Sequence, residues 1–239
     1  MIRIWHILLF ALALAAFAVA NAPASLFPQR TGVLTYSRAE GSVWQGRFEG
    51  ATLFGLRMTE VVWHLKPSRV LQGELAADVT LAGPELSGEV TIVRSLGARL
   101  QVRSNVLRLE GLPLENAEAV AGLTMARNLD VRFVAGQCVQ AQGSLESDLL
   151  VKATAGLGLQ GPSLSGQARC AGSEVQLPLN GQNASMSIET ELALRANGTA
   201  QWRGRSQSAI PQLEAIFMSL GFTPAEDGDG WEISRNLTW

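Results

Sequence analysis

The chain has 239 residues, of which 19 are Lys or Arg and 21 are Asp or Glu, so its formal net charge is −2. Apolar residues make up 47% of it and charged residues only 17%, which excludes a disordered protein and one that holds nucleic acid through its phosphates. The two histidines, His6 and His64, are too few for most hydrolase triads and histidine-rich metal sites. We therefore expect neither a histidine-based hydrolase triad nor a histidine-rich metal site.

An apolar segment without charged residues begins the chain. As a helix, residues 4–24 would span roughly 30 Å, the thickness of a bilayer core. Arg3 and the terminal amine would hold the start of the chain in the cytoplasm while the remainder is exported. Two interpretations stay open: a retained anchor whose helix ends near Pro23, and a signal peptide cleaved after the small residues at 18–20. Both place the bulk of the chain outside the cytoplasm.

The two cysteines agree with export. Cys138 and Cys170 are separated by 31 residues, and in an oxidising compartment such a pair is expected to form a disulfide. No further cysteine or histidine lies near either of them, which argues against a zinc site. We predict a disulfide between them, with two buried free thiols as the alternative.

Alternation of apolar and polar residues dominates the chain from Arg30 onward. In residues 71–81 the apolar side chains fall on every second position. The same alternation returns at residues 129–133, 145–151, 186–194 and 231–237. This period is typical of antiparallel strands with one buried face and one solvated face. The sequence therefore predicts a mainly β protein with a curved antiparallel sheet.

Two short stretches have helical spacing instead. They are residues 114–123 and residues 210–220. Pro113 and Pro211 stand where the first turn of a helix tolerates proline, and Gly221 is suited to end the second helix. Each stretch follows a strand, so we predict two short helices that cap the end or the open face of the sheet.

A six-residue pattern occurs twice. The segments at 83–88 and 161–166 read Gly-Pro-Glu-Leu-Ser-Gly and Gly-Pro-Ser-Leu-Ser-Gly, and they match at five of six positions. We expect two similar β units in one continuous sheet, with chance similarity in a glycine-rich protein as the alternative. The predicted domains are an anchor at 1–24, a first β unit with a short helix at 25–123, and a second β unit with a short helix and a C-terminal strand at 124–239.

Other charged clusters have ordinary explanations. The carboxylates within 226–229 fit a hairpin loop better than a metal site. The densest basic window spans residues 94–108, in which Arg99 and Arg103 share one strand face. This window could contact an acidic partner or lipid headgroups, but a solvated sheet face explains it as well. We expect His64 to be a half-buried structural residue.

A series of turns and strands in a fixed order resembles a known family. Residues 41–46, with Gly41, Trp44 and Gly46, are similar to its Gly-Thr-x-Trp-x-Gly turn, although Ser42 replaces the threonine. The series continues with the strand at 61–67, the Gly-Pro-x-Leu-Ser-Gly turn, the two proline-led helices and the final strand from residue 229. The turn residues of the repeat are Gly83, Pro84 and Gly88, then Gly161, Pro162 and Gly166. Over nearly its whole length the chain resembles the type II secretion system protein N (general secretion pathway protein N) family.

The resemblance implies a non-enzymatic accessory component of the machine that exports folded proteins across the outer membrane, with no catalytic residues, and we expect no metal site and no cofactor. Such a protein crosses the inner membrane once, with its N-terminus in the cytoplasm and its β domain in the periplasm. Its partners would be other type II secretion system components, reached through strand edges or sheet faces. The residues themselves leave a second reading open, a periplasmic lipid carrier whose curved apolar face shields acyl chains. A secreted hydrolase is a third reading, and it would depend on His64.

Overall fold

The protein was analysed as a computed structural model. It describes residues 6, 14, 17–18, 21–29, 34–53, 55–95, 97–114, 117–155, 158–208, 210, 213–219 and 221–238. Most of the predicted anchor at 1–24 lies outside the described residues. Within the described part of the chain, no helix has both the length and the apolar character needed to cross a membrane.

One antiparallel sheet of 16 strands forms the body of the described chain. The strands are β1 (Leu34–Thr35), β2 (Arg38–Gly41), β3 (Gln45–Leu53), β4 (Leu56–Leu65), β5 (Glu74–Ala82), β6 (Leu86–Ser95), β7 (Arg99–Leu114), β8 (Ala117–Val134), β9 (Gln137–Ser147), β10 (Leu164–Gln167), β11 (Arg169–Ala171), β12 (Glu174–Gln182), β13 (Met186–Arg195), β14 (Thr199–Ser208), β15 (Thr223–Pro224) and β16 (Trp231–Thr238). From β3 to β10 each strand pairs with the next one along the chain, as expected for strands joined by tight turns. The prediction of a mainly β fold with an antiparallel sheet is confirmed.

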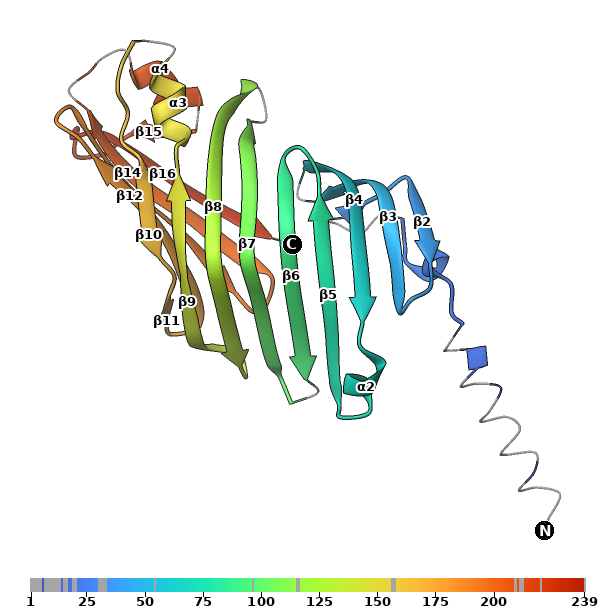
Figure 1. Ribbon diagram of the computed structural model, residues 1–239. Coiled ribbons are helices and arrows are strands. Elements are labelled where there is room, and N and C mark those ends of the chain that lie inside the picture. The colour runs from blue at the N-terminus through green and yellow to red at the C-terminus, as the bar shows by residue number, and fades with distance from the viewer. Residues whose placement is uncertain are drawn as a thin grey trace.

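The described helices are short and lie at the ends of the strands. The helical elements are η1 (Ala24–Leu26), α2 (Pro67–Val70), α3 (Leu149–Ala155) and α4 (Glu214–Ser219). Figure 1 shows α3 and α4 together at one end of the sheet and α2 at the opposite end. The helices α3 and α4, at the upper end in that view, therefore cover only one end of the strands and leave most of the length of the sheet uncovered.

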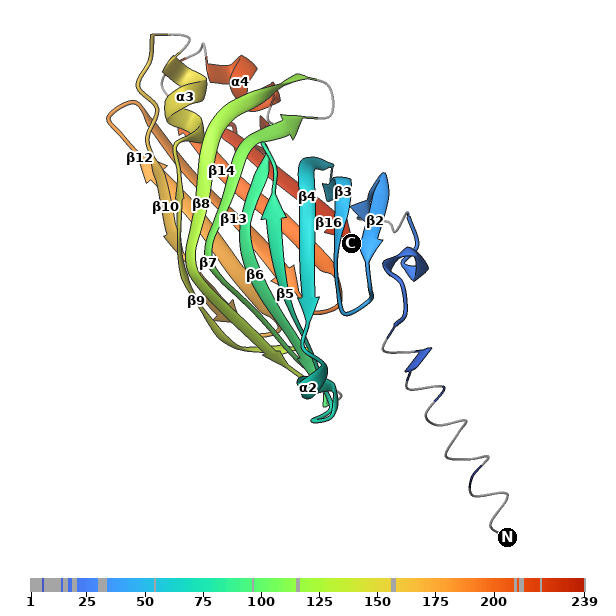
Figure 2. The ribbon, with the colours of Figure 1, turned by 45° about the vertical axis from the view of Figure 1, so that its right-hand side comes forward.

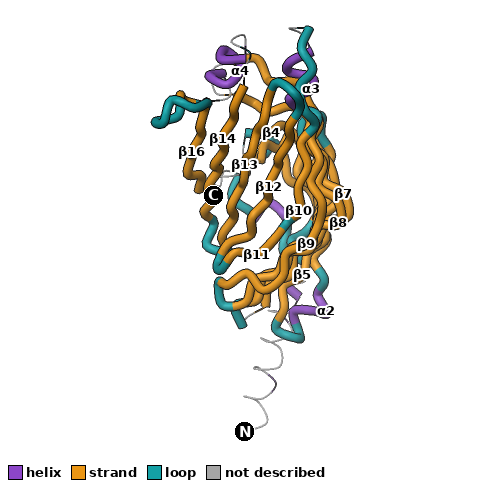
Figure 3. Tube along the Cα trace, turned by 90° about the vertical axis from the view of Figure 1, so that its left-hand side faces the viewer, coloured by secondary structure: helices purple, strands orange, loops and turns teal. Residues whose placement is uncertain are grey.

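The sheet curls into a trough. Strands β4 to β8 form one wall, β12 to β16 form the other, and the chain bends between them around β9 to β11 (Figures 2 and 3). We call the concave side of the sheet the inner face and the convex side the outer face. Val131 and Phe133 of β8 pack with Val175 of β12 across the bend, so the apolar side chains of the two walls meet on the inner face.

Three apolar clusters fill parts of the trough. At the N-terminal end, Phe48 stacks between Tyr36 and Trp63, with both pairs of ring centroids 4.2 Å apart. Beneath α3 and α4, Leu150 and Phe217 are fully buried within a second cluster. The third cluster is the contact across the bend. Because the sheet has no second layer, these clusters supply its apolar burial.

Cys138 and Cys170 form a disulfide at the bend, with their Cα atoms 5.5 Å apart. Cys138 belongs to β9 and Cys170 to β11, and Cys138 packs against the cluster around Val175. The bond therefore ties the first strand of the bend to its last strand.

The helix predicted at 114–123 is wrong. β7 extends to Leu114 and β8 begins at Ala117, and these two residues face each other in the ladder. Pairing between two long strands overrides the local helical spacing, which carries only a weak preference. Of the helix predicted at 210–220, the structure confirms the part that α4 covers, Glu214–Ser219.

The segment 145–151, read from its alternation as one strand, is also corrected. β9 ends at Ser147 and α3 starts at Leu149. Leu145 is buried on the strand and Leu149 is buried on the helix, but Val151, the third residue of the alternation, is exposed. Three apolar positions cannot separate these two arrangements.

The division into two β units stays a prediction. Its proposed boundary between residues 123 and 124 falls inside β8. The first copy of the repeated turn joins β5 to β6, and the second copy leads into β10. At Gly166 a Cβ atom would collide with the carbonyl of Pro178 on β12, so close strand approach requires glycine there.

Loss of the disulfide is expected to destabilise the fold. By loop entropy alone, closing a loop of this length contributes about 3 to 4 kcal/mol. The double variant Cys138→Ser, Cys170→Ser should lose roughly that amount of free energy of unfolding, measured by chemical denaturation of both proteins. Reducing agent should lower the stability of the wild type and leave the double variant unchanged. Equal stability of the two oxidised proteins would contradict the prediction.

Candidate functional site

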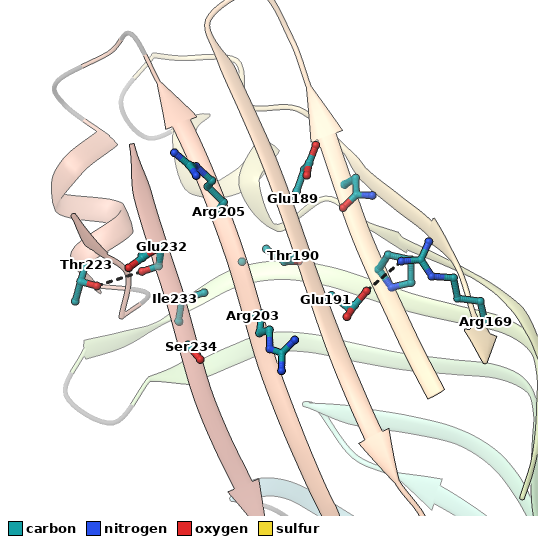
Figure 4. Close-up of a pocket in the computed structure, with 13 residues that line it drawn as sticks. Arg169, Glu189, Thr190, Glu191, Arg203, Arg205, Thr223, Glu232, Ile233 and Ser234 are labelled. Carbon is teal, nitrogen blue, oxygen red and sulfur yellow. Dashed lines mark hydrogen bonds and ion pairs between the residues drawn. The ribbon is translucent and has the colours of Figure 1, made fainter. Parts of the chain in front are cut away.

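The outer face of β12 to β16 carries paired charges. Glu189 lies opposite Arg205 in the ladder, and Arg169 forms an ion pair with Glu191 at 3.2 Å. Arg205 also bonds to Asp227 of the following loop. Figure 4 shows the side chains of Arg169, Glu189, Glu191 and Arg205 around a shallow depression between the strands. Exposed pairs of this kind contribute little energy, and their opposite charges leave no net field for a ligand.

The other charged residues named from the sequence also lie mainly on the outer face. Arg103 donates to Asp130 at 3.2 Å, and Arg99 shares its strand face by alternation along β7. His64 is exposed opposite Asp78, so the expectation of a half-buried histidine is wrong.

The acidic loop at 226–229 is joined to β14. Asp227 bonds to Arg205, which lowers the pKa of that carboxyl, and Asp229 accepts a hydrogen bond from Gln207 at 2.8 Å. Across the described residues no group of three or more His, Cys, Asp or Glu side chains could hold a metal ion. The loop is therefore a turn held against β14 by these two contacts.

The family-like turn residues lie in separate parts of the sheet. Gly41, Trp44 and Gly46 form the hairpin between β2 and β3. At Gly46 a Cβ atom would lie 2.6 Å from the Trp63 ring, and the Trp63 indole N–H donates to the Val43 carbonyl at 3.1 Å. Through these contacts with Trp63, the turn fixes one side of the N-terminal aromatic cluster. The remaining turn residues are Gly83, Pro84 and Gly88 at the start of β6, and Gly161, Pro162 and Gly166 before and within β10.

The inner face contains an apolar groove between the two walls. Its volume is about 310 Å³. It is lined by Leu109, Thr124, Leu145, Ser147, Leu149, Leu150, Leu164, Leu177, Leu179, Ile188, Thr190, Leu192, Trp202 and Phe222. These residues come from β7 to β10, from α3, from β12 to β14 and from the segment after α4. The alternation of apolar residues along both walls places them on one surface.

The hydroxyl groups in this groove already have partners. Thr124 and Ser147 share a hydrogen bond of 2.8 Å, and the Thr190 hydroxyl donates to the Leu179 carbonyl at 3.1 Å. A satisfied hydroxyl adds little polarity to the surface that a ligand would meet. The groove is therefore suited to an occupant that needs no hydrogen bonds.

Asp148 fixes the helix that closes the upper end of the groove. Its carboxylate accepts a hydrogen bond from the Leu123 N–H at 2.6 Å, and its own N–H donates to the Leu123 carbonyl at 3.0 Å. Lys152, one turn later, lies 3.2 Å from the carboxylate. The Leu123 N–H, and then Lys152, lower the pKa of Asp148. These contacts hold α3 so that Leu149 and Leu150 face the groove.

The two edges of the sheet differ. At the N-terminal edge, the Val43 N–H donates to the Ala22 carbonyl at 2.8 Å, and Pro23 forms a bridge with Ser42. At the C-terminal edge, β15 pairs only with Trp231 and Glu232 of β16. Beyond them, residues 233–238 have no partner strand on that side within the described part of the sheet.

The groove and the open edge are the two features that sequence reasoning did not locate. Alternation predicts an apolar face, but it does not reveal how far the opposing walls stand apart. The position of the open edge depends on the order of the strands in the sheet. β16 pairs with β14, and β15, which comes before β16 in the chain, pairs with the other side of β16.

A family model described as "Type II secretion system (T2SS), protein N" matches residues 33–233. No curated protein and no solved structure matches the chain.

Removing the Asp148 carboxylate should loosen α3. We expect Asp148→Ala to lower the free energy of unfolding by about 1 kcal/mol at pH 7, because the N–H of Leu123 loses a charged acceptor. The pKa of Asp148 is lowered in the folded protein, so its contribution is full above the ordinary aspartate value of about 4 and is lost as the pH falls through the folded value. The difference between the two proteins should therefore shrink below pH 4. Glu226→Ala, an exposed carboxylate of the 226–229 loop, is the control and should change stability little.

Proposed function

Because the chain belongs to the type II secretion system protein N family and is a component of that secretion system, we propose that it is a non-enzymatic accessory part of the machine. In this proposal its N-terminal segment crosses the inner membrane once, with the N-terminus in the cytoplasm. The β domain lies in the periplasm and acts through contacts with other components of the system.

The apolar segment and the disulfide support the proposed location. Residues 4–24 have the length and composition of a membrane-spanning helix, and a disulfide suits an oxidising compartment outside the cytoplasm. Residues 22 and 23 join the sheet next to β2. An anchor that ends there would hold the N-terminal edge toward the membrane and leave the C-terminal edge free for partners.

The observation that carries the proposed mode of contact is the open edge of β16. The Gly230 carbonyl accepts from the Ala225 N–H, and Glu232 is the ladder partner of Thr223. In an antiparallel strand the direction of the backbone groups alternates. Ser234, Asn236 and Thr238 therefore direct their N–H and C=O groups away from β14. A partner strand could pair with them by β-augmentation.

Proline at the edge should block this pairing. Asn236→Pro removes one outward N–H and leaves the ladder with β14 intact. With a photoreactive benzoylphenylalanine at Ser234 in living cells, we expect crosslinks to another component of the same secretion system, identified by mass spectrometry. Loss of a backbone hydrogen bond together with the steric effect of the ring should reduce these crosslinks about fivefold to tenfold.

The matched control is Asn236→Ala, which keeps the backbone N–H and should keep the crosslinks. Thermal unfolding of both variants checks that the domain is folded. Crosslinks that persist in a folded Asn236→Pro protein, or that involve no component of the secretion system, would count against docking at this edge.

The proposed topology has its own test. Alkaline phosphatase fused after residue 239 should be active, because that enzyme folds only outside the cytoplasm. Replacing residues 1–20 with a cleavable signal peptide keeps Ala22 and Pro23 in the sheet, and it should leave the fusion active but make it extractable from membranes by alkaline carbonate. An inactive full-length fusion, or one that resists carbonate extraction after the replacement, would refute the anchor.

A further inference from the structure

The inner face carries very little charge. Among the strand positions of β5 to β16 whose side chains are described, alternation and ladder register place only Arg94 and Arg235 as charged residues on that face. Neither forms an ion pair with any described residue. Most other arginines with described side chains are paired on the outer face. Both side chains are exposed, so their charges are solvated and accessible to an anionic group.

Arg235 lies at the border of the apolar groove. It stands directly opposite Trp202 in the ladder between β14 and β16, and Trp202 lines the groove. Its guanidinium group lies against Gly221, since a Cβ atom placed on that glycine would be 2.9 Å from the Arg235 Cζ. The next residue, Phe222, also lines the groove and packs edge-on against Trp202, with ring centroids 6.3 Å apart.

The size of the groove limits what it can hold. At about 30 Å³ for each water molecule, its volume equals about ten waters or a similar number of methylene groups. An α-helix with side chains is about 10 to 12 Å across, so the groove is too small for a helix. A polypeptide strand would bring N–H and C=O groups, and the hydroxyls of Thr124, Ser147 and Thr190 already have partners. An alkyl chain is narrower than a helix and has no groups that need hydrogen-bond partners.

We propose that this groove binds an acyl chain of an anionic phospholipid, with Arg235 contacting the phosphate of the headgroup. The apolar lining receives the alkyl chain, and the unpaired guanidinium at the border supplies two or more donors for phosphate oxygens. The choice of a phospholipid over other amphiphiles rests on the proposed function, because an inner-membrane anchor would place the trough beside a bilayer.

The test uses the full chain in vesicles. The protein is reconstituted into phosphatidylglycerol vesicles that contain a trace of phosphatidylglycerol with a diazirine in one acyl chain. After illumination, the crosslinked peptides are mapped by mass spectrometry. We expect crosslinks on groove residues of β12 to β14, such as Leu177, Leu192 and Trp202, in addition to any on residues 1–24.

Two variants test the two halves of the site. Leu192→Trp fills the groove opposite Trp202 and should reduce the groove crosslinks at least fivefold in every lipid. Arg235→Gln removes the cation and should reduce them about fivefold to tenfold with the phosphatidylglycerol probe, but should have little effect on crosslinks from a diazirine-bearing diacylglycerol, which has the same acyl chains and no phosphate. The matched control is Arg108→Gln, which removes an exposed outer-face arginine of β7 and should change nothing.

The outcomes separate this inference from the proposed function. Flotation with the vesicles reports the anchor, whereas crosslinks in the groove report the lipid site. Groove crosslinks that depend on Leu192 and Arg235 support the lipid site whether or not the chain floats. Crosslinks confined to residues 1–24, or groove crosslinks unchanged in folded Leu192→Trp and Arg235→Gln proteins, would overturn it. Circular dichroism and thermal unfolding establish that each variant is folded.

Discussion

An antiparallel sheet with one apolar face and no second layer must bury that face against itself. This constraint governs the molecule. The described helices are too short to form a covering layer, so the apolar side chains of the inner face pack against one another. The cluster around Phe48 and Trp63 is built from the chain between η1 and β7, whereas Val131 and Phe133 of β8 reach Val175 of β12 across the bend. Among β7 to β10 and β12 to β14 the packing is incomplete, and an apolar groove remains there.

The features at the two ends of the trough follow from the same constraint. Near the bend, the disulfide between β9 and β11 limits how far the walls can separate. At the upper end, α3 and α4 bury Leu150 and Phe217 against the sheet and close the space that the strands leave. Asp148, just before α3, is joined to Leu123 of β8 through its carboxylate and its backbone N–H. The disulfide in the bend and the contacts of α3 and α4 thus both restrain the sheet around the groove.

The sequence predicts correctly those features that depend on the local spacing of apolar residues. It fails where pairing between strands that are distant in the sequence determines the structure. The alternation at residues 186–194 predicts that Ile188 and Leu192 share one apolar face, and both line the groove. The same reasoning cannot choose between strand and helix for residues 114–123, because the ladder between β7 and β8 determines the result. Nor can it single out Arg235. Its place on the inner face follows from register with Trp202, and one residue of slip would move it to the outer face.

β16 combines the two proposed contacts in one strand. Its backbone offers an open edge at Asn236, while the preceding side chain, Arg235, lies on the inner face at the border of the groove. A partner strand paired at that edge would extend the second wall past Arg235. The added strand would cover more of an alkyl chain and reduce the access of water to the guanidinium, which strengthens its attraction for a phosphate. Docking of a secretion-system partner and lipid binding would therefore favour each other, since each stabilises the wall that the other uses.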